Sequence, residues 1–484
     1  MKYFKVRPTR PGIRVKNFKT GRANRQEIPL SITERLNFEQ IPLWVREVAD
    51  QLQAKGWQAF LVGGAVRDLL WGDAPQDWDL ATDALPQTVE EIFPRTIPTG
   101  KTYGAITVLS QEHPVEVTTF RADLRYEDGR HPAAICFENN IYADLSRRDF
   151  TINAIAYNFA TGALVDPFDG RRDAYRRILK TVGDPQLRFA EDGLRMFRFF
   201  RFLATRKLRP HPGSLRAIQP QWAEPVSLER IRDEFSKLLL GDRVRFALKG
   251  LIDSGLIRRF LPELVDNYAQ LDPALGRALR DHLLAATEAV RPKLHLRLAA
   301  LLHDLAKPAT ISYQNGKLHF LGHDEQGAAL CAIILKRLRY PGKTVATVSA
   351  LVRWHMFGLP PEASDGAVRR FIAKVGPELI PDLLELRRAD IVATGRIDRQ
   401  TPEMWRALSA RFNDLLASTP PPGQFQLAIN GTDLMERFHL NPGPFIGAIL
   451  KYLWGQVLED PALNQNEILF KKAAEYIRRE GLKT

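Results

Sequence analysis

The first third of the chain alternates short apolar runs with polar segments, as an α/β domain does. Apolar residues recur at helical spacing over 41–52, and the run 58–62 predicts a strand that ends at a Gly-Gly pair. Val, Ile and Thr gather over 105–110 and 114–120, which predicts two more strands, and another apolar element covers 151–159. The pattern therefore predicts one α/β domain over residues 41–180.

The remainder of the chain has a helical pattern. After Pro185, apolar residues recur every three or four positions with little strand signal. The predicted helices span 188–205, 228–240, 243–254, 294–302 and 328–339. Three consecutive prolines within 418–423 cannot continue a helix, so we expect a separate last segment over 424–484.

Length, cysteine content and charge narrow the class of protein. A chain of 484 residues with 45% hydrophobic content is long for one domain. Two cysteines without metal-ligand spacing, and no apolar run of roughly 18 residues, predict a cytoplasmic protein without a membrane span. The 69 Lys and Arg exceed the 56 Asp and Glu, which favours a polyanionic partner such as nucleic acid.

The first 40 residues are interpreted as a basic arm. The first 25 include nine Lys or Arg, and no acidic residue precedes Glu27. This composition suits a solvated tail and an arm that contacts RNA equally well, and an organellar transit peptide is a third reading.

The clearest candidate chemistry lies just after the Gly-Gly pair. Asp77 and Asp79 are spaced by two, so on a strand both carboxylates point to one face, where they can hold Mg²⁺. Gly63 and Gly64 allow backbone N–H groups to approach a triphosphate. An Asp-x-Asp sequence alone is also typical of a solvated turn. Together these residues point to nucleotidyl transfer.

Two metal ions need a third carboxylate, and Glu116 is the best candidate. It lies between two valines of a predicted strand, where a charge is costly without a cation, so we expect it to be buried with a ligand. The alternative is a strand whose polar face holds Glu116 and Thr118 in water.

Six blocks in order give the chain a close resemblance to a known family. They are LVGGAVRD (61–68), DWDLATD (77–83), VEVTTFR (115–121), YEDGRHP (126–132), LSRRDFTINAIAY (145–157) and RFAEDGLRMFRFFRF (188–202). The chain thus resembles the tRNA nucleotidyltransferase and poly(A) polymerase family, in its bacterial and eukaryotic class. The resemblance implies an α+β protein, with a polymerase-beta-like mixed-sheet head followed by an all-α neck, body and tail.

The resemblance also implies roles for individual residues. Asp77 and Asp79 would bind the catalytic Mg²⁺ ions. The residues around the triphosphate would be Gly63, Gly64, Arg67 and Lys101, and those that meet the ribose or help to fix the nucleotide would be Arg148 and Asp149.

The family assigns base recognition to Asp192 and Arg195, and hydrogen-bond chemistry gives an independent reason. On a helix, residues three apart share a face and present an acceptor beside a forked donor. Cytosine and adenine both offer an amino donor next to a ring-nitrogen acceptor, whereas uracil and guanine reverse this pattern. The pair would accept CTP and ATP. The alternative is an ordinary ion pair within one helix.

The expected reaction is attack of a tRNA 3′-hydroxyl on the α-phosphate, with release of pyrophosphate. In this family, enzymes that add only CC lack a flexible segment that residues 121–132 supply here at full length. The segment does not separate addition of CCA from addition of A alone, or from a poly(A) polymerase.

A second candidate site lies downstream. It comprises His282, His303, Asp304, His323, His355 and Asp390, mostly on predicted helices. Such residues can ligate one or two metals for phosphoester hydrolysis. The set resembles the HD phosphohydrolase superfamily, and a divalent transition metal is the candidate ion. In that superfamily such a domain can be a catalytic phosphohydrolase or a scaffold. The alternative to metal binding is that the histidines are ordinary helix residues, as single histidines often are.

The expected domains are a basic arm (1–40), a head (41–180), an RNA-binding neck and body (181–270), an HD domain (271–400) and a tRNA-gripping tail (401–484). Two rival functions remain: a phosphohydrolase with an inactive head, and a non-catalytic RNA-binding protein. The sequence leaves the oligomeric state open.

Overall fold

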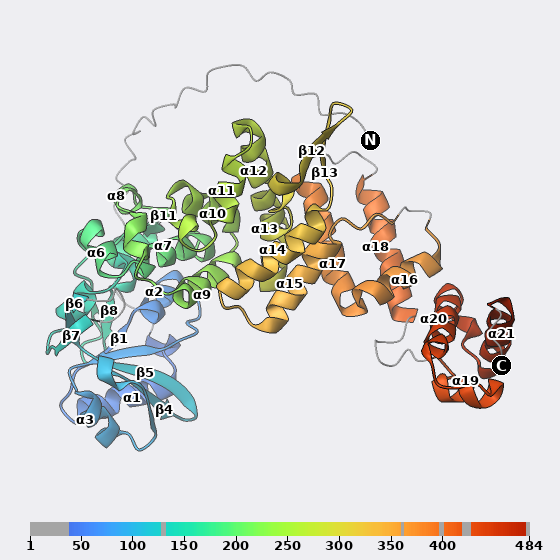
Figure 1. Cartoon of the computed structure of the whole chain (residues 1–484). Coiled ribbons are helices and arrows are strands. Elements are labelled where there is room, and N and C mark those ends of the chain that lie inside the picture. The colour runs from blue at the N-terminus through green and yellow to red at the C-terminus, as the bar shows by residue number, and fades with distance from the viewer. Residues whose placement is uncertain (1–37, 127–131, 360–362, 396–400, 419–426, 481–484) are drawn as a thin grey trace. The chain divides into compact units, whose positions relative to one another are not determined.

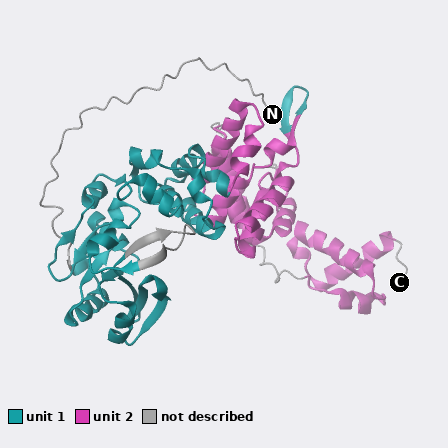
Figure 2. Cartoon of the chain, turned by 60° about the vertical axis from the view of Figure 1, so that its left-hand side comes forward, with its two compact units in different colours: residues 1–260, 313–319 teal, residues 261–312, 320–484 magenta. Residues whose placement is uncertain are grey.

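The computed structural model describes residues 38–126, 132–359, 363–395, 401–418 and 427–480 (Figure 1). Residues 1–37 of the predicted basic arm, the centre of the segment 121–132 and the triple proline lie outside the described residues. The chain divides into two compact units (Figure 2). The first runs to Phe260 and includes Tyr313–His319, and the second comprises Leu261–Ser312 and Phe320 onward.

A mixed sheet forms the centre of the head. Its strand order is β3-β4-β5-β2-β1-β8-β9. The strands are β1 (Ala59–Val62), β2 (Asp79–Thr82), β3 (Thr96–Gly100), β4 (Ala105–Ser110), β5 (His113–Thr119), β8 (Ala156–Asn158) and β9 (Leu164–Val165). Strand β2 runs parallel to β5 and antiparallel to β1. A separate hairpin joins β6 (Arg121–Tyr126) to β7 (Pro132–Phe137).

Both faces of this sheet are covered, because side chains alternate across β1. Leu61 packs into a core with apolar residues of α1 (Leu43–Ala54), α2 (Gly64–Trp71) and α3 (Pro86–Ile92). Phe60 packs into a second core with residues of α4 (Ile141–Ser146) on the opposite face. Burial on both faces explains why 58–62 reads as a continuous apolar run.

Helices and short strands complete the first unit. They are α5 (Gly170–Tyr175), α6 (Pro185–Glu191), α7 (Leu194–Thr205), α8 (Pro212–Arg216), α9 (Leu228–Leu239), α10 (Val244–Asp253), β10 (Ile178–Leu179) and β11 (Arg209–Pro210). The helices predicted over 228–240 and 243–254 are confirmed to within one residue at each end.

The single helix predicted over 188–205 is wrong. The chain forms α6 and α7 instead, with Asp192 in an extended conformation between them. At Gly193 a methyl group would lie 2.0 Å from the carbonyl oxygen of Trp222. The backbone therefore passes too close to a neighbouring segment for any side chain, and the periodicity of the flanking residues carries no sign of this.

The second unit is largely helical. Its helices are α11 (Glu263–Ala269), α12 (Pro273–Ala289), α13 (Leu294–Leu302), α14 (His323–Arg337), α15 (Gly342–Trp354), α16 (Asp365–Val375), α17 (Ile380–Ala393), α18 (Thr401–Ser418), α19 (Gly431–Phe438), α20 (Pro444–Glu459) and α21 (Asn466–Arg479). The hairpin β12 (Ile311–Gln314) and β13 (Lys317–Phe320) was not predicted. Among the described residues, no helix is both long and apolar enough to cross a membrane.

The close approach at Gly193 yields a prediction about stability. Gly193→Ala should lower the free energy of unfolding by about 1–3 kcal/mol, because the added methyl group displaces the Trp222 backbone. Gly455→Ala is the matched control, since it lies in α20 with open space around it, and helix propensity should leave it neutral or more stable. Thermal unfolding measures both variants, and an unchanged midpoint for Gly193→Ala would contradict the prediction.

Candidate active site and candidate metal centre

The turn between β1 and α2 brings backbone close to two charged side chains. Gly63 has φ 71° and ψ −129°, a conformation that favours glycine, and it caps the start of α2. A methyl group there would lie 2.9 Å from Nη1 of Arg148 and 3.7 Å from Oδ2 of Asp79. The glycine therefore allows the chain to pass between a cation and a carboxylate.

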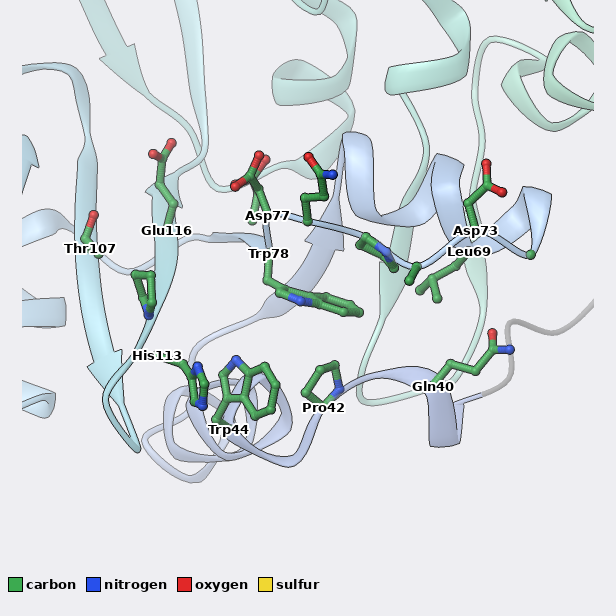
Figure 3. A pocket seen from close by; sticks show the side chains of 16 residues that line it. Gln40, Pro42, Trp44, Leu69, Asp73, Asp77, Trp78, Thr107, His113 and Glu116 are labelled. Atoms are coloured by element: carbon green, nitrogen blue, oxygen red, sulfur yellow. The ribbon is translucent and has the colours of Figure 1, made fainter. Parts of the chain in front are cut away.

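Three carboxylates meet at the edge of the sheet beside this turn. Asp79 is the first residue of β2, and its register partners are Val62 on β1 and Glu116 on β5. Asp77 lies in a bend before β2, not on the strand as expected, yet its charge still acts on Asp79. Figure 3 shows Asp77 and Glu116 on the same side of a cavity that Trp44, Trp78 and His113 also line.

Electrostatics of this cluster favour a cation. Burial raises the pKa of Asp79 to about 6, with further contributions from the charges of Glu116 and Asp77, while Arg148 opposes the shift. Glu116 is exposed, so the expectation that it is buried is wrong; only its valine neighbours are buried. A divalent ion would offset the repulsion between these neighbouring carboxylates, and carboxylate oxygens are ligands that Mg²⁺ prefers.

An arginine-rich cavity of about 880 Å³ opens from the glycine turn and the Asp pair. Its walls include the predicted residues Gly63, Gly64, Arg67, Asp77, Asp79, Arg148, Asp149, Asp192 and Arg195. Further cations, which the sequence reasoning missed, are Arg147, Arg198, Arg201, Arg206, Arg230 and Lys237. A cavity with this lining suits a polyphosphate.

Lys101 is the one predicted triphosphate residue that does not line this cavity. It lies in a short turn after β3, and its Nζ is 2.6 Å from Oε2 of Glu90. The contacts of the structure therefore do not support its assigned role.

Two buried networks hold the cavity's arginines in place. Asp144, fully buried, accepts hydrogen bonds from Arg147 at 2.6 Å and Arg148 at 3.0 Å. Burial alone would raise the pKa of Asp149, but the charge of Arg198 and a hydrogen bond from Asn153 hold it at about 2. Asp149 thus positions Arg198, at 2.7 Å, and its oxygens are engaged by the protein itself.

Asp192 and Arg195 both line the cavity, but they do not share one helix. One carboxylate oxygen of Asp192 accepts a hydrogen bond from Arg230 Nη2 at 3.0 Å, and the other oxygen accepts one from the Leu194 amide. Arg195 donates to Glu191 Oε2 at 2.6 Å and to the carbonyl of Arg147 at 2.9 Å. No motif in the sequence indicated Arg230, because it reaches the site from α9.

The predicted HD residues meet in the second unit. They come from α12 (His282), the end of α13 (His303 and Asp304), the start of α14 (His323), the end of α15 (His355) and α17 (Asp390). Two groups share Asp304: one with His282, His303 and Asp390, the other with His323 and His355. Within each group the candidate ligand atoms lie within 4.8 Å of one another.

Backbone contacts orient three of these histidines toward the centre. Nδ1 of His303 is 2.9 Å from the Ala300 carbonyl, and Nδ1 of His323 and of His355 are each 2.6 Å from a carbonyl. When Nδ1–H donates to a carbonyl, the Nε2 lone pair becomes available to a metal. The Nε2 atoms of His323 and His355 lie 3.3 and 3.5 Å from Oδ1 of Asp304.

The shared carboxylate is the strongest sign that this cluster fits a metal. Both oxygens of Asp304 are buried, and among the described residues neither accepts a hydrogen bond of good geometry. Burial would raise the pKa of Asp304, but the charge of His303 and contacts to three histidines hold it well below its usual range. Lys307 also makes an ion pair with Asp304. The cluster can therefore hold a metal ion.

Comparison with known proteins identifies the family. The Poly A polymerase head domain matches residues 59–180, the RNA- and SrmB-binding site of polymerase A matches 221–267, and tRNA nucleotidyltransferase domain 2 matches 329–473. The CCA-adding enzyme of Geobacillus stearothermophilus is 33% identical over 427 residues, which cover 87% of this chain and 94% of that protein. That of Anoxybacillus flavithermus is 33% identical over 439 residues, 90% of this chain and 97% of that protein.

The fold leads to the same family. The crystal structure of the Bacillus stearothermophilus CCA-adding enzyme in complex with CTP has a TM-score of 0.71 with 29% identity, over 91% of this chain and 100% of that one. A nucleotidyltransferase head of this kind works with a divalent metal. The chain belongs to the CCA-adding enzyme family, whose tRNA nucleotidyltransferases add nucleotides from CTP and ATP to the tRNA 3′ end.

Proposed function

We propose that Asp77, Asp79 and Glu116 hold two Mg²⁺ ions and that the arginine-lined cavity binds the triphosphate of CTP or ATP. The observation that carries this proposal is the register of β2, which sets Asp79 beside Glu116 on one side and beside the Gly63 turn on the other. When bound, the two ions would neutralise charge on the phosphates and make the attacking hydroxyl more acidic.

The chain's own residues bind and orient the nucleotide. Arg148 is held by Asp144 with its Nη1 beside the Gly63 turn, where we place the phosphates. Arg67 is buried and fixed by hydrogen bonds to Asp68 and Asn153, so little side-chain entropy is lost when it meets an anion. Transfer of this type depends mainly on such positioning and on charge stabilisation.

Base selection is assigned to Asp192 and Arg195. Asp192 offers an acceptor to the amino group that cytosine and adenine share, and Arg195 offers N–H donors to the adjacent ring nitrogen. Arg230 and Glu191 fix these two groups. Because both bases present the same pattern, one site serves both CTP and ATP, which supports addition of the complete CCA sequence.

The buried histidine cluster supports a second candidate function. We infer that it holds one or two divalent transition-metal ions, with Asp304 as the shared ligand, and that it hydrolyses a phosphoester. The charge of Lys307 next to Asp304 suits an anionic substrate. A phosphohydrolase with an inactive head is not favoured, because the carboxylates proposed for catalysis in the head lie beside one another.

The tail is assigned to tRNA contact. The exposed cations Lys451, Lys471, Arg478 and Arg479 lie on α20 and α21, and they can pair with phosphates. The tRNA substrate and two free cysteines, Cys136 and Cys331, support a cytoplasmic location.

Removal of a head carboxylate tests the assignment of the metal site. Asp79→Asn should lower CMP incorporation into a tRNA that lacks CCA by roughly 1000-fold, since a carboxylate that would hold the metal ions is lost. Asp50→Asn, an exposed carboxylate on α1, should incorporate at the wild-type rate. Radiolabelled single-nucleotide addition measures both, and near wild-type incorporation by Asp79→Asn would refute the assignment.

Base selection gives a second prediction. Asp192→Asn should lower the ratio of kcat/KM for CTP over UTP by roughly 10- to 100-fold, because an amide can donate to the uracil carbonyl. Asp184→Asn is the control, since Asn also caps a helix and Asp184 caps the start of α6, at the opposite end from Asp192 and outside the cavity. An unchanged ratio for Asp192→Asn would exclude Asp192 from base reading.

Metal loading tests the second unit. Addition of Mn²⁺ or Ni²⁺ to metal-free protein should raise the melting temperature, because a ligand that binds the folded state stabilises it. Asp304→Asn should abolish this rise and the metal content found by elemental analysis. Asp382→Asn, whose partner His295 lies 2.6 Å away outside the cluster, should keep both. Wild-type metal content in Asp304→Asn would contradict the proposed site.

A further inference from the structure

A second cavity of about 910 Å³ lies against the same carboxylates. It shares Gln76, Asp77 and Asp79 with the arginine-lined cavity, and Glu116 forms part of its wall. Figure 3 shows Asp77 and Glu116 on one side of this cavity, with aromatic rings below them. The carboxylates therefore stand at the boundary between two cavities.

The lining of this second cavity is unlike that of the first. Trp44 of α1 and Trp78, which precedes β2, contribute indole rings. The imidazole of His113 stacks on Trp44, with ring centroids 4.2 Å apart and an interplanar angle of 22°. Among the described residues that line it, none is Lys or Arg. The cavity thus suits the flat face of a base and is a poor site for a polyphosphate.

The geometry of the reaction links the two cavities. In phosphoryl transfer, the attacking and leaving oxygens lie roughly in line on opposite sides of phosphorus. If the triphosphate occupies the arginine-lined cavity, the leaving pyrophosphate is on that side. The attacking 3′-hydroxyl must then approach the Asp pair from outside that cavity, and the aromatic cavity is lined by the same carboxylates.

We propose that the aromatic cavity binds the 3′-terminal nucleoside of the acceptor RNA, with its base stacked on the rings of Trp44, His113 and Trp78. This proposal rests on the proposed function, because it takes the triphosphate site as given. The 3′-oxygen attacks the α-phosphorus, the bond from that phosphorus to the bridging oxygen breaks, and pyrophosphate leaves with the electron pair. The hydroxyl proton passes to solvent.

Stacking on aromatic side chains tolerates different bases, which suits an acceptor whose last nucleotide changes between additions. The terminal residue is first the tRNA's own last nucleotide and then each added C. A site that reads hydrogen bonds would have to reject some of these ends, whereas a ring face accepts all of them.

The test is a double-mutant cycle between the protein and the RNA. His113→Ala and Trp44→Ala should each raise the KM for a tRNA ending in CC by about 10-fold, while the KM for ATP changes less than 2-fold. His113→Phe should restore the KM, since it keeps a ring over Trp44. His113 is exposed at the start of β5, so its removal leaves the core intact, whereas Trp44 packs partly on the core.

The second arm of the cycle uses a tRNA whose 3′-terminal nucleotide has no base. Wild-type protein should lose at least about 10-fold in kcat/KM with this acceptor, and His113→Ala should lose little more, because the missing base and the missing ring belong to the same stack. Losses that multiply would overturn the proposal and point to another occupant, such as the chain's own basic residues 1–37. Asp79→Asn run in parallel separates the two ideas, since its failure to stop incorporation would refute the proposed function itself.

Discussion

The parallel pairing of β2 with β5 is the constraint on which the head depends. It sets Asp79 beside Glu116, while the antiparallel pairing with β1 sets the same residue beside Val62 and the glycine turn. A one-residue slip in either register would turn a carboxylate to the opposite face of the sheet, into an apolar core. The cores on the two faces, around Leu61 and Phe60, oppose such a slip. Packing of these two cores therefore fixes the positions of the carboxylates.

Buried ion pairs and aromatic side chains likewise determine the lining of the cavities around those carboxylates. Asp144 and Asp149 are buried carboxylates that form ion pairs with arginines. Those arginines give the first cavity beside the carboxylate cluster a cationic lining. The second cavity beside the same carboxylates has an aromatic lining. In the second unit, Asp304 has a comparable position, since it joins two groups of candidate ligands from separate helices. In both units one carboxylate connects elements that are distant in the sequence.

The sequence predicts many of the helices, strands and turns because the local residue pattern determines them. The helix at 294–302, the strand at 105–110 and the glycine turn follow from periodicity and from the freedom of glycine. Long-range contacts decide what was missed. The break at Gly193 arises from the Trp222 backbone, the partner Arg230 arrives from α9, and Lys101 meets Glu90. Glu116 is exposed between buried valines because β5 alternates, as the polar-face reading of that strand allowed.

We propose that the register of β2 assembles the carboxylates that hold two metal ions in the head. Mn²⁺ binding measures this most directly, in protein that carries Asp304→Asn to remove the second centre and is saturated with a non-reactive CTP analogue. We expect two bound Mn²⁺ ions per chain, and a loss of affinity of about 100-fold or more when Asp79→Asn is added. Unchanged stoichiometry and affinity in the Asp79→Asn protein would contradict it.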